Sequence, residues 1–154
     1  MDAKQICFLS ATELSNLIRQ GDLSPVEVID AHLKRIEELE PTLNSFITVQ
    51  AEEARAAAVK LEREVRLGEY RGPLHGIPLG LKDVYDTKGV RTTMGCEPYA
   101  DRIPKEDSTT VERLREAGAV SLGKLNLHTL EFGPLGENDY YGDMHNPWDT
   151  ARNT

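Results

Sequence analysis

The sequence is poor in cysteine. Among its 154 residues only Cys7 and Cys96 occur, and neither lies in a CxxC pair or at a Cys/His ligand spacing, which argues against a structural zinc site. One disulfide is arithmetically possible. However, two distant cysteines in an acidic chain of this size are more typical of reduced thiols in a cytoplasmic protein.

The sequence also lacks a long apolar run. The longest uncharged stretch, residues 72–81, is about ten residues long and contains glycine and proline, whereas a membrane-spanning helix needs about twenty apolar residues. Residues 1–7 hold no basic region followed by an apolar segment, so the sequence predicts no signal peptide. We therefore expect no membrane partner.

Positive charge is in deficit. Lysine and arginine number 18 against 26 aspartates and glutamates, which gives a formal net charge of −8. This balance disfavours nonspecific binding of nucleic acid, and we expect none for this segment. Hydrophobic residues at 39% and charged residues at 29% are typical of a globular chain with enough apolar material for one domain.

Residues 1–71 are expected to form a helical segment. A capping-box signature, Ser10 with Glu13 three residues later, predicts a helix over residues 11–20. A second helix is expected to begin at Pro25, and Pro41 is expected to end it. A short strand follows over residues 46–49, and a third helix over residues 51–67.

Residues 72–154 are expected to contain the strands. The run that is rich in glycine and proline predicts a turn and then a buried strand over residues 79–84. A helix that carries Val111 and Leu114 precedes a second buried strand over residues 119–122, and this order is typical of an α/β crossover. The tail over residues 133–154 is expected to be an ordered loop.

Lys82 is the first candidate for chemistry, because it ends an apolar run that is expected to be buried. A buried lysine must be paired or lose its proton, and an unprotonated lysine can serve as a general base. Two structural alternatives remain open at this point. Lys82 forms an ion pair with Asp83 or with a residue elsewhere, or its side chain reaches solvent at the end of the strand.

Other polar side chains favour structural roles. His128 and Glu131 have the i, i+3 spacing of some metal sites, but no second such pair exists, so a polar contact is the better interpretation. His75 and Cys96 are expected to be structural, with Cys96 as a small buried residue. Trp148 is expected to anchor the loop by burying a large apolar area.

No complete active site can be found from these residue types alone. Lys124 follows Gly123, but Leu125 stands where a phosphate loop needs serine or threonine. A GxSxG nucleophile motif is also missing from the chain.

Several segments, in order along nearly the whole chain, resemble the amidase signature family. The segment over residues 72–83, which bears Lys82, is the most informative, and an N-terminal helix segment also matches. The N-terminal helix match is residues 24–28, and the further matching segments are residues 92–96, 107–120, 123–127 and 146–149, with Cys96 standing where the family more often has serine.

The resemblance implies a hydrolase that cleaves carboxamide C–N bonds through a Ser–cis-Ser–Lys triad and needs no cofactor. It places the triad lysine at Lys82 and the substrate as a small-molecule amide. It further implies an α/β fold, with N-terminal helices and part of a mixed β-sheet covered by helices. Residues 1–154 are then the N-terminal part of a single amidase domain, divided into a helical segment over residues 1–71 and the lysine-bearing part over residues 72–154.

The family's Gly/Ser-rich stretch, which supplies both triad serines, has no counterpart here, since no Gly-Gly-Ser-Ser-Gly run is present. We therefore expect a fragment that is inactive alone and leaves a face or edge of its sheet uncovered. Three alternatives remain. The parent is an amidase or the amidase subunit of a tRNA-dependent amidotransferase, the chain is a non-catalytic binding module, or it complements a separate chain that carries the catalytic core.

Overall fold

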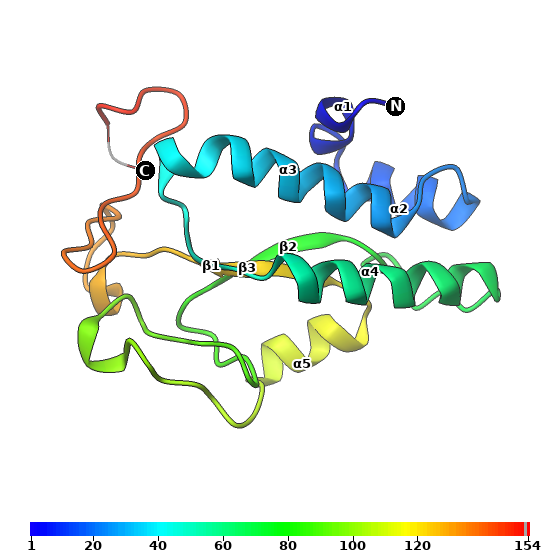
Figure 1. The fold of residues 1–154 in the computed structure, drawn as a ribbon. Helices are drawn as coiled ribbons and strands as arrows, with labels where there is room; N and C mark the ends of the chain where they lie inside the picture. Colours follow the sequence, from blue (N-terminus) through cyan, green and yellow to red (C-terminus); the bar gives the residue numbers. More distant parts are fainter. Residues whose placement is uncertain (153) are drawn as a thin grey trace. The chain divides into compact units, whose positions relative to one another are not determined.

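The computed structural model describes residues 1–152 and 154 and combines helices with a small sheet (Figure 1). The helices are α1 (Ala3–Cys7), α2 (Ala11–Gln20), α3 (Pro25–Leu43), α4 (Ala51–Arg66) and α5 (Thr109–Glu116), and the strands are β1 (Phe46–Val49), β2 (Pro78–Lys82) and β3 (Val120–Leu125). Two short 3-10 helices, η1 (Glu97–Tyr99) and η2 (Thr129–Glu131), complete the described elements.

The chain divides into two compact units. The first unit comprises Met1–Glu37, Gln50–Leu79 and Arg113–Leu122, and the second comprises Glu38–Val49, Gly80–Glu112 and Gly123–Thr154. Each unit is therefore assembled from segments that are distant in the sequence.

The first unit has a helical core. Capping boxes begin α1 at Asp2 and α2 at Ser10, the latter as the sequence predicts, because each side-chain oxygen accepts a hydrogen bond from a free backbone N–H of the first turn. Gly21 ends α2 in the left-handed region, with φ of 79°. The packed apolar side chains that form the core are Ile6, Leu14, Ile18, Leu23, Val28, Ala31 and Ile77.

Helix α3 continues past Pro41, so the prediction that Pro41 ends it is wrong. The helix runs to Leu43, and the amide of Asn44 still donates to the carbonyl of Glu40 at 3.0 Å. A proline in the last turn disturbs little of the helix beyond it, since only the final hydrogen bonds remain to be made. The Glu40 carboxylate then accepts hydrogen bonds from the Ser45 hydroxyl and the Phe46 amide, both at 2.6 Å.

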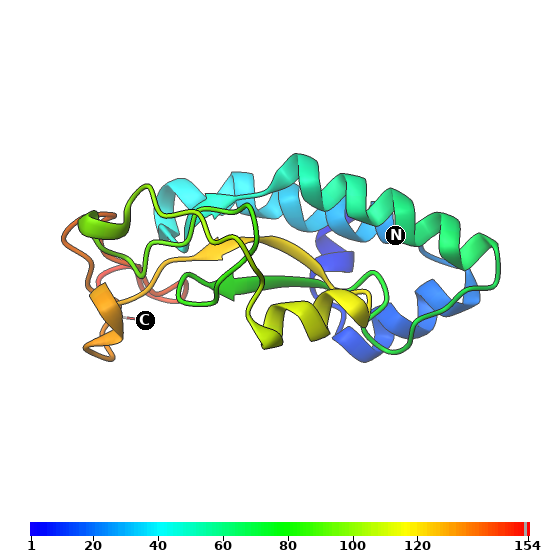
Figure 2. The same cartoon turned by 90° about the horizontal axis from the view of Figure 1, so that it is seen from below.

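The three strands form a mixed sheet in the order β1-β3-β2, and Figure 2 shows the β3 arrow beside β2. Strands β1 and β3 are antiparallel, with Thr48 opposite Lys124. Strands β2 and β3 run in the same direction, since hydrogen bonds join Val120 to Ile77 and Asp83 to Leu125. This confirms the expected α/β fold with part of a mixed sheet.

Strand bounds differ from the prediction at the two places that matter for chemistry. Strand β2 ends at Lys82, and Asp83 and Val84 belong to the turn that follows. Strand β3 continues beyond Leu122 to Leu125, because Gly123 adopts φ of 153° and allows β1 to approach closely. Lys124 therefore lies within a strand. Within the described residues, no helix is long and apolar enough to cross a membrane.

Candidate functional site

Lys82 lies at the carboxyl end of β2, and its side chain is 45% exposed, so the expectation that it is buried is wrong. Successive side chains of a strand point to opposite sides, and this alternation buries Leu81 and Asp83 while turning Lys82 outward. The Lys82 ammonium forms an ion pair with Glu131, whose side chain is similarly exposed. Both structural alternatives, an ion pair and access to solvent, therefore apply.

Glu131 reaches Lys82 from η2. Leu130 and Glu131 both adopt positive φ, 53° and 59°, which residues other than glycine rarely do. Within the described part of the chain, His128 and Glu131 belong to no group of three or more metal-ligating side chains. Glu131 instead provides the charge that faces Lys82.

Directly after Lys82, a buried ion pair joins the turn that follows β2 to strand β3. The Asp83 carboxylate and the Lys124 ammonium are both fully buried, and Oδ1 lies 3.3 Å from Nζ. The other carboxylate oxygen, Oδ2, accepts from the backbone amide of Thr93 at 2.8 Å and from its hydroxyl at 2.5 Å. Lys124 is thus the buried lysine of this region.

Burial lowers the pKa of the Lys124 ammonium, because the interior disfavours charge, and the nearby Asp83 carboxylate opposes that change. Asp86 also favours the charged form, whereas Arg102 disfavours it. Asp86 and Arg102 are hydrogen-bonded to each other at 2.6 and 2.7 Å. Two ion pairs therefore meet within this unit.

The buried role of Lys124 is not predicted by the residues next to it, which match only part of a phosphate-loop pattern. The available signal is its position: Lys124 follows Val120, Leu122 and Gly123, all of them buried. A lysine in such a run needs an acidic partner, and the sequence offers Asp83 at the end of the neighbouring strand.

The remaining candidate residues divide between confirmed and corrected predictions. His75 is fully buried and structural, with Nε2 2.9 Å from the carbonyl of Leu61. Cys96 is buried and donates to the Thr93 carbonyl, and neither cysteine is in a disulfide. The prediction for Trp148 is wrong: its side chain is 95% exposed, since no described part of the chain packs over it.

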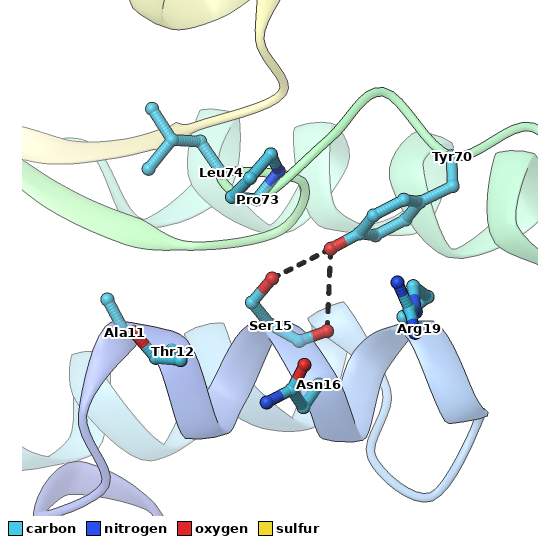
Figure 3. Close-up of a pocket in the computed structure, with 8 residues that line it drawn as sticks. All are labelled: Ala11, Thr12, Ser15, Asn16, Arg19, Tyr70, Pro73 and Leu74. Atoms are coloured by element: carbon cyan, nitrogen blue, oxygen red, sulfur yellow. Dashed lines mark hydrogen bonds between the residues drawn. The ribbon is translucent and has the colours of Figure 1, made fainter.

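A pocket of about 430 Å³ lies in the first unit, between α2 and the loop after α4 (Figure 3). Tyr70 points to α2, where its hydroxyl lies 2.7 Å from the Ser15 hydroxyl. Arg19 is the charged side chain of this lining, which contains no carboxylate, histidine or lysine, so the pocket offers no ordinary general base. The catalytic candidate therefore remains Lys82.

Comparisons with known proteins agree over most of the chain. A family model described as Amidase matches residues 27–154. A glutamyl-tRNA(Gln) amidotransferase subunit from Halorhodospira halophila is 48% identical over 143 residues, which cover 91% of this chain and 29% of that protein.

Solved structures show the same fold. The native peptide amidase from Stenotrophomonas maltophilia matches with a TM-score of 0.86 and 32% identity, over 94% of this chain and 31% of that chain. A vestigial protein complex that reveals the origins of an s-triazine catabolic enzyme matches with a TM-score of 0.90 and 34% identity, over 94% and 32% of the two chains. The sequence thus spans less than a third of the length of these relatives.

Proposed function

Because the chain belongs to the amidase signature family, we propose that the protein cleaves carboxamide C–N bonds and that Lys82 is the base of its Ser–cis-Ser–Lys triad. The proposed substrate is a small-molecule amide. The 154 residues hold no Gly-Gly-Ser-Ser-Gly run, so the two serines of this triad belong to polypeptide outside the present sequence. That polypeptide is the remainder of the same protein or a partner chain that carries the catalytic core.

The observation that carries this proposal is the placement of Lys82. Its backbone is fixed by β2, while its side chain stands at the strand end, half exposed and paired with Glu131. In the proposed reaction Nζ accepts a proton from the bridging serine, which accepts one from the serine nucleophile. Since an ammonium cannot accept a proton, Lys82 must give up a proton and leave its ion pair with Glu131 before it acts as the base.

A second candidate is the amidase subunit of a tRNA-dependent amidotransferase. It is favoured by the 48% identity to a glutamyl-tRNA(Gln) amidotransferase subunit. In that case the released ammonia passes to a charged tRNA, and the protein has partner subunits. In both candidate functions the protein cleaves an amide, and Lys82 is the proposed base. A cytoplasmic location is part of the proposal, supported by two cysteines that form no disulfide.

The first experiment isolates the protein from its source cells with an antibody against residues 24–40 and determines its mass by immunoblot. The isolated protein then reacts with a fluorophosphonate, which modifies activated serines whatever the amide substrate. We expect a band well above 17.2 kDa, or a co-purifying partner chain, with the fluorophosphonate on a serine outside residues 1–154. A 17.2 kDa protein that is alone and unlabelled overturns the proposal and favours a non-catalytic binding module.

The second experiment compares Lys82→Ala with Lys88→Ala, an exposed lysine of the same unit, in the source cells. Lys82→Ala is expected to reduce serine labelling and ammonia release from carboxamides by about 10³-fold or more, because the nucleophile loses its base. Lys88→Ala is expected to match the unmodified protein. Labelling that survives Lys82→Ala contradicts the assignment of the base.

The same preparations separate the two candidate functions. A stand-alone amidase releases ammonia from a carboxamide without other components. An amidotransferase subunit co-purifies with further subunits, and its ammonia release increases when charged tRNA is added.

A further inference from the structure

A tight turn begins at Lys82. The amide of Tyr85 donates to the Lys82 carbonyl at 3.0 Å, which closes the turn over residues 82–85. The direction in which the Lys82 side chain leaves the strand therefore depends on how this turn is held.

Asp83 holds the turn through all of its backbone polar groups and its side chain. Its amide donates to the carbonyl of Leu125 at 3.1 Å, and its carbonyl accepts from Met94 at 3.0 Å. Its carboxylate is bound by Thr93 at 2.8 and 2.5 Å. The residue next to Lys82 is thus attached to β3 and to the segment around Thr93.

Lys124 holds the other end of the same turn. Its ammonium donates to the carbonyl of Tyr85 at 2.8 Å and to the Thr92 hydroxyl at 2.6 Å, and it lies 3.3 Å from Asp83. One buried cation therefore ties both the start and the end of the turn to strand β3.

We propose that Asp83 and Lys124 are positioning residues for Lys82, which together clamp the turn that starts at Lys82 and keep the interior beside it electrically neutral. This inference rests on the proposed role of Lys82 as the base. Two buried charges of this kind are stable only as a pair, because either charge alone would remain uncompensated in the interior.

The charge balance gives the proposal a signature that simple structural damage does not produce. Removing the Lys124 ammonium leaves a negative charge beside Lys82 and favours its protonated form. Removing the Asp83 charge leaves a positive one and favours the neutral amine. The other charged groups near these residues, Glu131 at Lys82 and the bonded pair Asp86 and Arg102, stay the same in every variant.

The experiment measures the acylation of each lysine in the protein isolated from its source cells, by brief exposure to acetic anhydride followed by mass spectrometry, between pH 7 and 10. The variants are Lys124→Met, Asp83→Asn and the double variant, with Lys105→Met as the matched surface control. At pH 8 we expect Lys82 acylation to slow about threefold in Lys124→Met and to rise about threefold in Asp83→Asn. The double variant and the control are expected to match the unmodified chain.

Milder variants cover the case in which a single charge change prevents folding. Thr93→Val removes a hydroxyl that donates to Asp83, so the carboxylate is less well compensated and Lys82 acylation is expected to slow to a smaller extent. Thr93→Ser keeps the hydroxyl and is expected to restore the rate. Thermal unfolding followed by circular dichroism shows which variants are folded.

The outcomes separate this inference from the proposed function. If the folded single variants shift Lys82 acylation in the same direction, or leave it unchanged, the positioning role is wrong even where Lys82→Ala abolishes serine labelling. A second outcome is that the two variants shift Lys82 acylation in opposite directions while serine labelling survives Lys82→Ala. The Asp83–Lys124 pair then acts on Lys82, but Lys82 is not the base. The proposed function is then wrong, and so is the positioning of a base.

Discussion

At the residue scale, the most demanding electrostatic feature is the Asp83–Lys124 pair. Both side chains are fully buried, and removing one partner of such a pair commonly destabilises a protein by about 3–5 kcal/mol. A neutral pair of similar size can be equally stable, so stability alone does not explain two buried charges. Their attachment to the turn at Lys82 provides a reason.

Asp86 gives a pH-dependent prediction at the same scale. The hydrogen bond from Arg102 lowers the pKa of the Asp86 carboxyl relative to the unfolded chain. The contribution of this hydrogen bond to the free energy of unfolding is therefore fully present above the pKa that Asp86 has in the unfolded chain. It is lost as the pH falls through the lower pKa of Asp86 in the folded protein, below about pH 4. Because the side chains of Asp86 and Arg102 are both about a third exposed, we expect their interaction to contribute at most about 1 kcal/mol to the free energy of unfolding.

The measurement is urea unfolding of the unmodified chain and of Asp86→Asn between pH 7 and 2. The difference in the free energy of unfolding is expected to be largest at neutral pH and to decline in acid. Asp101→Asn, an exposed carboxyl of the same unit, serves as the control. A difference that stays constant down to pH 2 shows that the carboxylate charge is not the stabilising factor.

At the element scale, strand β3 is shaped by the absence of a side chain at Gly123. A Cβ atom at this position lies only 2.1 Å from the carbonyl oxygen of Thr48 on β1. The close approach of the two strands, and therefore the burial of Lys124 in β3, requires glycine here.

We predict that Gly123→Ala destabilises the protein by about 3 kcal/mol or more, because the backbone of β1 cannot give way as a flexible side chain can. Gly89→Ala is the matched control, since Gly89 also has positive φ but has no atom within 4 Å of its Cβ position. Gly89→Ala is expected to lower the free energy of unfolding by about 1 kcal/mol, from backbone strain alone. Urea unfolding measures both variants, and equal losses contradict the role of the β1 contact.

At the scale of the whole molecule, the second unit exposes more large apolar side chains than a free surface favours. Phe132 is 93% exposed and Trp148 95%, with Leu130 and Leu135 also exposed in the same part of the chain. Exposed apolar groups of this size are typical of surfaces that another polypeptide covers. The chain spans less than a third of the length of the relatives that it matches.

We therefore predict that the 154-residue chain self-associates when it is expressed alone. Sedimentation velocity is expected to show species larger than 17.2 kDa, and Phe132→Ser with Trp148→Ser is expected to reduce them. Val59→Ser, an exposed apolar residue on α4 of the first unit, is the control. A monodisperse monomer that unfolds cooperatively contradicts the prediction.

The local elements were predictable because their signals are local. Capping at Ser10, the start at Pro25 and the helix over residues 51–66 depend on neighbours within one or two turns, and all three are present. The end of α3 was not predictable from Pro41, since the hydrogen bond from Asn44 to Glu40 decided it. Strand β3 was predicted too short because its second half depends on contact with β1.

The sequence by itself determined the α/β class, the family and the presence of Lys82 in a strand, because these follow from composition, local periodicity and ordered motifs. Only the tertiary structure decided which lysine is buried. Strand alternation turns Lys82 outward to Glu131, and the pairing of β3 with its neighbours brings Lys124 to Asp83 from 41 positions away. Burial and charge pairing depend on such distant contacts, and no local pattern of residues records them.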